Sequence, residues 1–396
     1  MPPAARGLFL KKPPPGPLQK LLIRSGLDVE VFIQSLIKKE IVPGISILVA
    51  KKDNVLFKKQ YGWKSLLPQK QVLEAHTIYD LASLTKPLVT AFLTVYLAEQ
   101  EKVSLDTRIR KIFPALPAYF EITLKQLLIH TSGLPAWYPF YLFGSDYFSQ
   151  FLLLPLETRP GKWVNYSCVG YILLYYLVEK VAGISFKDLA RHVIFQPLGL
   201  RNTFLTVPDE FKKDAAPTEK GNQYEKNMAE QWARKQAVTQ EYHERVNRFK
   251  WRTSIIQGEA HDVNSHTLGG TAGNAGLFST AEDVFRICLE FFPATASLLK
   301  IPSLQLFWKN FTPFNKSHRT VGFKRNSSFL TSGGRALSRK AIGHSGFTGT
   351  SLWLDPREET TVILLTNRIH PEVRDINFDK IRRKLHRLLV KETKHL

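Results

Sequence analysis

The sequence predicts an α+β protein in which β-rich runs lie near both ends of the chain and the middle is mostly helical. A helical apolar pattern and a hairpin pattern follow each other between residues 28 and 59. Two more β-rich runs and a last amphipathic helix lie between residues 350 and 389. The stretch from about 81 to 330 has helical patterns with few strands between them. The predicted order is helix, hairpin, long helical middle, strands and helix.

The N-terminal elements follow from local patterns. Asp28 is a good N-cap, and apolar residues follow it at helical spacing. These residues are Val29, Phe32, Ile33, Leu36 and Ile37. Next, the runs Gly44–Ala50 and Val55–Lys59 flank the turn pair Asp53-Asn54, which predicts a β-hairpin.

Local patterns also predict the elements of the middle and of the C-terminal end. The strongest helical segments of the middle are Pro87–Ala98, Leu124–Ile129, Gly170–Val181 and Ala281–Phe292. Residues 220–251 are densely charged and predict a solvated helix or a mobile insertion. Near the end, Thr350–Leu354 and Thr360–Thr366 flank a turn that contains proline, and a last helix follows. Its apolar face consists of Phe378, Ile381, Leu385, Leu388 and Leu389.

Composition sets limits on the class of protein. The 396 residues allow two to three domains at about 150 residues each, and 44% hydrophobic with 22% charged residues is typical of a globular protein. Two cysteines cannot build a disulfide framework. The net charge of +21 suggests a nucleic-acid partner, but zinc-finger spacings and aromatic-basic repeats are missing. We expect no specific nucleic-acid binding, although the basic surface could contact anionic surfaces.

The N-terminal segment and the apolar runs bear on location. No apolar run reaches the roughly eighteen residues that a transmembrane helix needs. Lys11-Lys12 and Pro13–Pro15 stand where a signal peptide would have its apolar core, so residues 1–27 are predicted to be a flexible arm. We therefore expect a cytoplasmic protein, with export left open if the start codon is misassigned.

One Ser-x-x-Lys pattern stands out from two others. Ser35/Lys38 and Ser297/Lys300 have the same spacing but lie at exposed or helix-terminal positions. Ser83-Leu84-Thr85-Lys86 is followed directly by Pro87. Because proline costs about 3 kcal/mol inside a helix, the helix should begin near Ser83. Ser83 then lies on the first turn, at the positive end of the helix dipole, with Lys86 on the same face.

Three motifs of this sequence resemble, in order, the active-site motifs of the class C β-lactamase-like serine hydrolases and related penicillin-binding proteins. They are Ser83-Leu84-Thr85-Lys86, Tyr166-Ser167-Cys168 and His344-Ser345-Gly346. Further strings that resemble the family are Leu127–Leu134, Pro160-Gly161 and Gly269–Thr280. The resemblance runs from about residue 28 to 390.

The resemblance implies a mechanism with an acyl-enzyme. Ser83 Oγ would attack a carbonyl carbon while Lys86 and Tyr166 move protons. The oxyanion would lie between the backbone N–H groups of Ser83 and Phe347, and water would then hydrolyse the ester. His344 is included among the catalytic residues. Cys168, Ser345, Gly346 and Phe347 are expected to bind substrate, and no cofactor is implied.

Two departures from the family motifs bear on the substrate. Cys168 stands where the family usually has Asn or Asp, so an amide that would steady the lysine is missing. His344 replaces the usual lysine, so a fixed positive charge for a substrate carboxylate is replaced by a mostly neutral group. Both changes argue against efficient β-lactam hydrolysis. They favour an esterase or a D-amino-acid peptidase that acts on a small-molecule or peptide substrate. The alternative is a non-hydrolytic acyl-binding or sensor protein of the same fold.

The resemblance also implies a fold of the β-lactamase/transpeptidase type. An antiparallel sheet built from both chain ends would carry the first and last helices, with segments 28–80 and 331–396 as the sheet domain. Residues 81–330 would form an inserted, mainly helical domain, and the active site would lie between the two. His261-Asp262 with Asn264 and His266 lacks a metal-binding spacing, so no metal site is expected.

Overall fold

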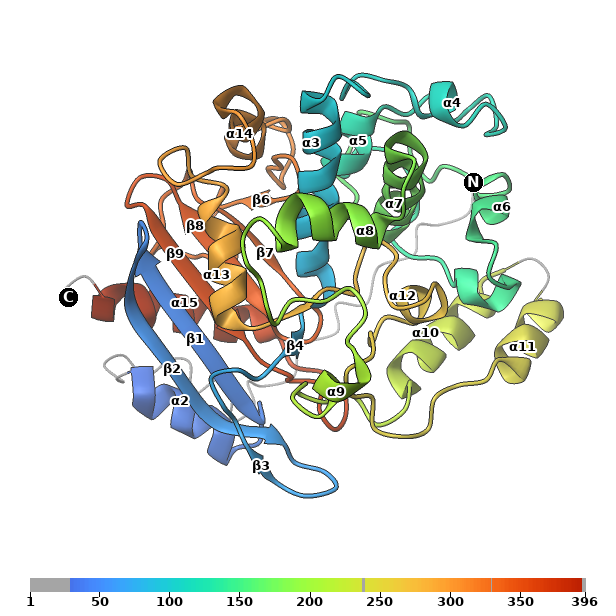
Figure 1. The fold of residues 1–396 in the computed structure, drawn as a ribbon. Helices are drawn as coiled ribbons and strands as arrows, with labels where there is room; N and C mark the ends of the chain where they lie inside the picture. The colour runs from blue at the N-terminus through green and yellow to red at the C-terminus, as the bar shows by residue number, and fades with distance from the viewer. Residues whose placement is uncertain (1–28, 237–238, 329, 394–396) are drawn as a thin grey trace, which may run out of the picture.

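The computed structural model describes residues 29–236, 239–328 and 330–393. The arm predicted for residues 1–27 lies outside this range. A seven-stranded antiparallel sheet has the order β3-β2-β1-β9-β8-β7-β6, so strands from both ends of the chain meet at its centre (Figure 1). Its strands are β1 Gly44–Lys51, β2 Asn54–Ser65, β3 Gln71–Val72, β6 Lys324–Arg325, β7 Ile342–Ser345, β8 Ser351–Asp355 and β9 Thr360–Leu365. The predicted α+β class and the antiparallel sheet are confirmed.

The first hairpin differs from the prediction at its turn. Lys51 pairs with Asn54, so the two-residue loop is Lys52-Asp53 and Asn54 already belongs to β2. Lys52 takes the left-handed conformation, with φ of 55°, that short hairpin loops require. Strand β2 also extends to Ser65, beyond the predicted end at Lys59, because it pairs with β1 along its length and then with β3.

The last segment of the sheet begins earlier than the prediction. Strand β6 lies before residue 331, inside the region assigned to the helical domain, because its two residues pair with Ile342 and Gly343 of β7. Such a two-residue edge strand has too few positions to show an alternating pattern in the sequence. The division of the chain into two domains stays a prediction.

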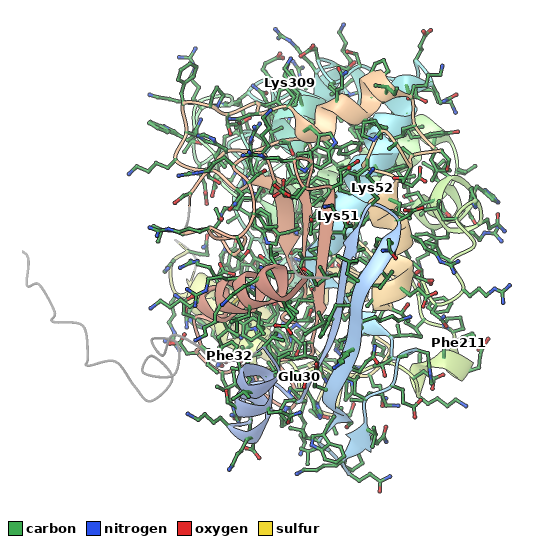
Figure 2. The ribbon with its side chains drawn as sticks, turned by 90° about the vertical axis from the view of Figure 1, so that its left-hand side faces the viewer. Glu30, Phe32, Lys51, Lys52, Phe211 and Lys309 are labelled. Carbon is green, nitrogen blue, oxygen red and sulfur yellow. The ribbon has the colours of Figure 1, made fainter. Side chains whose placement is uncertain are left out.

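Each face of the sheet contributes to a different hydrophobic core. Ile47 and Val49 of β1 pack with helices α2 (Val29–Lys38) and α15 (Phe378–Thr393). Leu48 and Ala50, which alternate with them, belong to the core of the helical region. Figure 2, which views the sheet from the side, shows α2 and α15 on one side and α13 on the other. The sheet is therefore buried between two layers.

The helical region supplies the second layer. Its α-helices are α3 Phe92–Glu99, α4 Ile109–Ile112, α5 Leu124–Leu128, α6 Tyr147–Phe151, α7 Cys168–Ala182, α8 Phe186–Ala190, α9 Asp209–Lys212, α10 Gln223–Ala233, α11 Thr239–Arg248, α12 Val263–Thr267, α13 Ala281–Leu289 and α14 Ile301–Trp308. The short strand β4, Tyr79–Asp80, lies just before this region and pairs with β5, Phe278–Ser279, inside it. No single described helix is long and apolar enough for a membrane span, although the bent pair formed by Cys168–Ala182 and Phe186–Phe195 passes on length and composition.

The charged segment 220–251, described except for residues 237–238, was predicted as a solvated helix or a mobile insertion, and it forms helices whose polar sides are exposed and whose apolar side is packed. It forms α10 and α11, and Ala229, Ala233 and Val246 are buried in the core of the helical region. Trp232 packs edge-on against Tyr138 with ring centroids 5.4 Å apart. A few small or aromatic residues are enough for this packing. Because most residues of the segment are charged, its overall composition does not reveal the apolar side.

Candidate active site

Ser83 lies on a strained turn directly after β4. The preceding residue, Ala82, has φ of 48°, a left-handed conformation that non-glycine residues rarely adopt. Its N–H donates to Asp80 Oδ1 at 2.8 Å, which holds the turn. Residues Ala82–Leu84 form a 3-10 turn, and a π-helical turn, Lys86–Ala91, carries Pro87 at its start. The helix therefore begins where the proline predicted, but its first turns are not α-helical.

Lys86 is the centre of the site. Its ammonium is fully buried and its Nζ lies 3.0 Å from Ser83 Oγ, 2.8 Å from the backbone oxygen of Asn274 and 3.4 Å from Cys168 Sγ. These three acceptors match the three hydrogens of an ammonium group. The same Nζ lies 5.0 Å from the centre of the Tyr166 ring. The first two motifs therefore meet at one nitrogen atom.

Helix α7 positions the second motif. Ser167 caps the helix through a hydrogen bond from the N–H of Gly170 to its Oγ, and Cys168 is the first helical residue. The Ser167 N–H donates to His130 Nδ1 at 3.1 Å, and the His130 ring contacts Tyr166 with centroids 4.6 Å apart. Cys168 lines the cavity and contacts Lys86, so the structure places it where the motif resemblance led us to expect it.

The charges at the site follow from burial and neighbours. Burial by itself disfavours charged Lys86, but Cys168 and Tyr166 outweigh it and raise the pKa of Lys86 above its ordinary value. Burial raises the pKa of Tyr166, although Lys86 opposes the shift. Burial also raises the pKa of the Cys168 thiol. The charge of Lys86 therefore favours proton loss from the phenol and the thiol next to it, while burial opposes that loss.

The third motif lies on β7 and the loop after it. His344 Nδ1 lies 3.0 Å from the backbone oxygen of Ser345, so the hydrogen bond requires a proton on Nδ1 and leaves a lone pair on Nε2. Nε2 is buried and has no partner among the described residues. Burial, with Lys86 and Arg319 nearby, places the pKa of His344 well below its ordinary value. His344 is therefore neutral and presents an acceptor beside Tyr166, whose ring centroid is 5.8 Å away.

The two expected oxyanion donors are free. Gly346 N–H is taken by the Thr350 backbone oxygen at 2.8 Å. Within the described part of the chain, the N–H groups of Ser83 and Phe347 make no intramolecular hydrogen bond. Thr348 Oγ1 donates to the backbone oxygen of Asp80 at 2.7 Å, which joins the loop after β7 to the turn that carries Ser83. Two unused donors therefore belong to segments that are joined directly.

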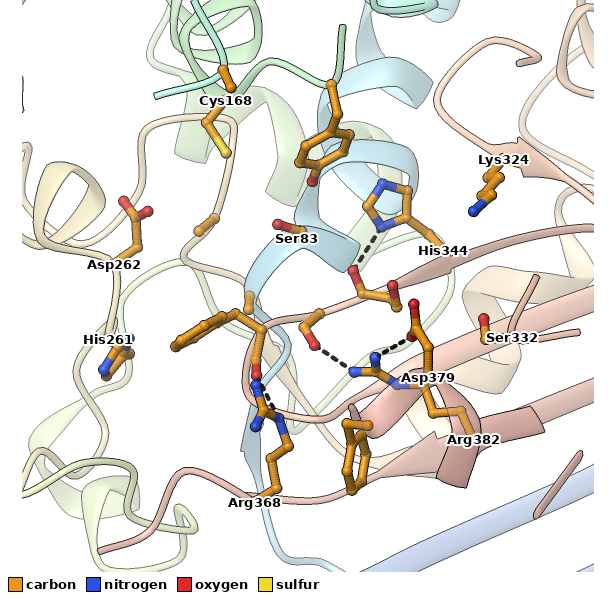
Figure 3. Close-up of a pocket in the computed structure, with 18 of the residues that line it drawn as sticks. Ser83, Cys168, His261, Asp262, Lys324, Ser332, His344, Arg368, Asp379 and Arg382 are labelled. Carbon is orange, nitrogen blue, oxygen red and sulfur yellow. Dashed lines mark hydrogen bonds and ion pairs between the residues drawn. The ribbon is translucent and has the colours of Figure 1, made fainter. Parts of the chain in front are cut away.

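A cavity of about 630 Å³ opens over Ser83 and has two chemically different ends. Figure 3 shows Cys168, His261 and Asp262 on one side of Ser83, with His344 and Lys324 on the other. The first side also contains the buried carboxyl of Glu225 from α10. Arg319 and Lys324 lie on the second side, near His344. Arg368 and Arg382 also line the cavity. Seven of the eight site residues predicted from the motifs line this cavity. The eighth, Lys86, lies beneath it and contacts three groups there.

Sequence reasoning missed the cations Arg319 and Lys324. Arg319 is 8% exposed and, among the described residues, neither side chain forms an ion pair. Both lie close enough to His344 to lower its pKa. No motif marks them, and only their position on or beside the edge strand β6 brings them to the cavity. Arg319 and Lys324 therefore bring positive charge to the cavity near His344 from another part of the chain.

The residues around His261 form no metal centre. Among the residues described, no group of three or more His, Cys, Asp and Glu side chains could hold a metal ion. His261 Nε2 is instead paired with the Glu219 carboxylate at 2.8 Å, and both side chains are buried. Asp262 accepts from the Ser265 N–H at the start of α12 and from Asn274 Nδ2. These contacts support the loop at the mouth of the cavity.

Comparison with known proteins identifies the family. The model of the family described as Beta-lactamase matches residues 29–385. The chain belongs to the beta-lactamase family. It is a serine hydrolase of this fold, as the three motifs indicated.

Two relatives and one solved structure show the range of the family. A putative D-alanyl-D-alanine carboxypeptidase of Escherichia coli K12 is 28% identical over 368 residues, which cover 84% of this chain and 80% of that protein. An N-acetylmuramyl-L-alanine amidase of Bacillus subtilis is 27% identical over 386 residues, covering 87% and 82%. A class C beta-lactamase of Rhodobacter sphaeroides shares the fold with a TM-score of 0.67 at 17% identity, covering 92% and 99%.

Proposed function

We propose that this beta-lactamase family member hydrolyses small amides or esters through an acyl-enzyme on Ser83, in the manner of a D-amino-acid peptidase or an esterase. The observation that carries the proposal is the 3.0 Å contact between Ser83 Oγ and the buried Lys86 Nζ. Serine is a weak nucleophile until a base next to it accepts its proton. Lys86 and Tyr166 are the titratable groups in contact with Ser83.

The reaction is written as two displacements. After the Lys86/Tyr166 pair has released one proton to solvent, Ser83 Oγ attacks the carbonyl carbon and its proton passes to that pair, while the carbonyl oxygen becomes an oxyanion facing the N–H groups of Ser83 and Phe347. The bond to the leaving group breaks as the pair returns the proton to its nitrogen or oxygen. Water then attacks the ester, the pair takes its proton, and Ser83 is released as the free hydroxyl. The acid product and the amine or alcohol account for all atoms.

The cationic end of the cavity favours a leaving group that carries a carboxylate. Arg319 is a buried cation that forms no ion pair among the described residues, which is costly, and a substrate carboxylate next to it and to the half-buried Lys324 would reduce that cost. The names of the two relatives, a putative carboxypeptidase and an amidase, describe amide hydrolysis. Together these points favour a D-amino-acid amide with a free carboxylate over a neutral ester as the substrate.

A serine-directed fluorophosphonate probe tests the nucleophile. The wild-type protein should be labelled on the peptide that contains Ser83, and Ser83→Ala should not be labelled. Lys86→Met and Tyr166→Phe should each slow labelling by about 10²-fold or more, with less than additive effects because the three groups act together. Labelling at another residue, or equal labelling of Ser83→Ala, would rule out the assignment.

Burst kinetics with p-nitrophenyl acetate separate a hydrolase from the alternative, an acyl-binding sensor. A hydrolase continues past one equivalent of p-nitrophenol, whereas a sensor stops at the acylated state. The substrate class is then tested with N-acetyl-D-alanyl-D-alanine and its C-terminal amide. We expect the free carboxylate to be preferred by at least tenfold in kcat/KM, and equal rates would contradict the role of Arg319 and Lys324.

A further inference from the structure

An arginine of the last helix holds the loop after β7 through hydrogen bonds to its backbone. Arg382 lies on α15, and its guanidinium Nη2 donates to the backbone oxygen of Gly346 at 2.6 Å and to that of Thr350 at 3.1 Å. Its Nε donates to the oxygen of Gly349 at 3.3 Å, and Nη1 pairs with Asp379 at 2.9 Å. Figure 3 shows the guanidinium between Asp379 and the loop. The side chain is 6% exposed and its charge is directed at backbone carbonyls.

The hydrogen bond to the Gly346 carbonyl also fixes the direction of the Phe347 N–H. The C=O of Gly346 and the N–H of Phe347 belong to one planar trans peptide group, in which they point in opposite directions. Holding the carbonyl toward Arg382 therefore directs the Phe347 N–H away from Arg382. That N–H makes no intramolecular hydrogen bond in the described chain, and Phe347 lines the cavity over Ser83.

The guanidinium also changes the strength of this donor. Hydrogen bonds to an ionised donor are stronger than neutral ones, and bonds in a chain polarise one another. A charged donor on the carbonyl makes the N–H of the same amide a better donor. The other oxyanion amide lies between Ala82 and Ser83. Its carbonyl also accepts a side-chain hydrogen bond, but from a neutral group, the Thr85 hydroxyl, at 2.7 Å.

We infer that Arg382 is a positioning residue that aims and polarises the Gly346–Phe347 amide as an oxyanion donor. The inference rests on the proposed acyl-enzyme function. A role in holding a substrate carboxylate fits less well, because Nε, Nη1 and Nη2 all donate to groups of the protein. Arg368 supports the same loop by donating to the Phe347 oxygen at 3.2 Å, one peptide group further on.

The test uses Arg382→Met and Arg382→Lys in the full chain, with Arg383→Met as the matched control. Arg383 is the neighbouring arginine of α15 and also donates to carbonyls, but to those of Leu330 and Thr331, away from Ser83. The readouts are the acylation rate with p-nitrophenyl acetate and the infrared carbonyl stretch of the acyl-enzyme made from ester labelled with carbon-13 at the carbonyl. A merely structural role would not move this stretch in a folded variant.

We expect Arg382→Met to acylate about tenfold more slowly with KM changed by less than about threefold. This loss is smaller than the roughly 10²–10³-fold that follows removal of an oxyanion donor. Its acyl carbonyl should absorb at higher frequency than in the wild type, Arg382→Lys should fall between them, and Arg383→Met should match the wild type.

Each other outcome has a defined meaning. A folded Arg382→Met with the wild-type rate and carbonyl frequency would overturn the inference, and so would loss of folding in both Arg382 variants, which would assign the residue to the fold alone. If Arg382→Met unfolds, Arg382→Lys decides by the same readouts. Failure of the wild-type protein to form any acyl-enzyme would instead contradict the proposed function.

Discussion

Residue 168 is where this chain departs most from the motifs of its family, and the structure shows what the departure does. Cys168 Sγ lies 3.4 Å from Lys86 Nζ, so the thiol occupies a position from which a side chain can contact the lysine. A thiol is a weak acceptor and a weak donor. The backbone oxygen of Asn274, at 2.8 Å, supplies the stronger contact to the ammonium. The lysine is thus held without a side-chain amide, but no amide is offered to the substrate from this position.

Cys168→Asn should raise nitrocefin turnover relative to p-nitrophenyl acetate turnover. The new amide would hydrogen-bond the amide that a β-lactam presents and that a simple ester does not. The expected gain is that of one hydrogen bond, about 0.5–1.5 kcal/mol or roughly two- to tenfold in the ratio of kcat/KM values. Steady-state kinetics with both substrates measure it.

The control is Cys168→Ser, which changes the same atom without adding an amide and should leave the ratio near that of the wild type. A Cys168→Asn protein with a native circular dichroism spectrum and an unchanged ratio would show that another feature sets the preference. His344 and the α10–α11 segment would then be the next positions to vary.

At the scale of elements, helix α10 brings a carboxyl group into the cavity. Glu225 is 6% exposed, and Trp137 Nε1 donates to its Oε1 at 3.1 Å. Burial, and then repulsion by Asp262, raises the pKa of Glu225 to about 8. A carboxyl group with such a pKa is protonated at neutral pH in the folded protein. The charged segment 220–251 therefore places a neutral acid beside the site.

Glu225 should make the protein less stable as the pH rises. Between its unfolded pKa of 4.5 and its folded pKa of about 8, the folded state keeps a proton that the unfolded state has released. The free energy of unfolding therefore falls with pH across this window, by up to about 1.4 kcal/mol per pH unit, and the contribution is fully lost above about pH 8. Urea denaturation of the wild type and Glu225→Gln from about pH 5 to about pH 9 measures it.

Glu225→Gln should flatten this dependence because its side chain does not titrate. The matched control is Glu244→Gln on the neighbouring helix α11, where Glu244 is half exposed and pairs with Arg248. It should keep the wild-type slope. A Glu225→Gln slope that equals the wild-type slope would contradict the raised pKa.

At the scale of the whole molecule, the proposed reaction does not account for the net charge of +21. Figure 2 shows Lys51 and Lys52 at the end of the first hairpin and Lys309 at another part of the surface. Lysines this far apart suit a general attraction to anionic surfaces better than a single specific site. Such an attraction should be strongly screened by salt.

We therefore predict that the protein sediments with phosphatidylglycerol vesicles at about 20 mM NaCl and is released at about 300 mM, because the Debye length falls several-fold over this range. Phosphatidylcholine vesicles are the control and should bind little at either concentration. Equal binding to both lipids, or binding that salt does not weaken, would contradict an electrostatic origin.

The sequence by itself determined the family and most of the local elements, and it predicted the nucleophile. Proline 87 and the Ser83/Lys86 spacing located the start of the helix, because both act within one turn of the chain. The apolar spacing of α2 and α15 likewise depends on neighbours a few residues apart. Resemblance added Tyr166 and the third motif.

Only the tertiary structure decided what surrounds these groups. Lys86 contacts the backbone of Asn274, Arg382 contacts the backbone of Gly346, and backbone groups have no residue type that a sequence pattern could mark. Arg319 and Lys324 reach the cavity because β6 joins the edge of the sheet beside β7. Contacts between segments distant in sequence depend on how the sheet and helices pack, so the charge of the site became visible only in the folded chain.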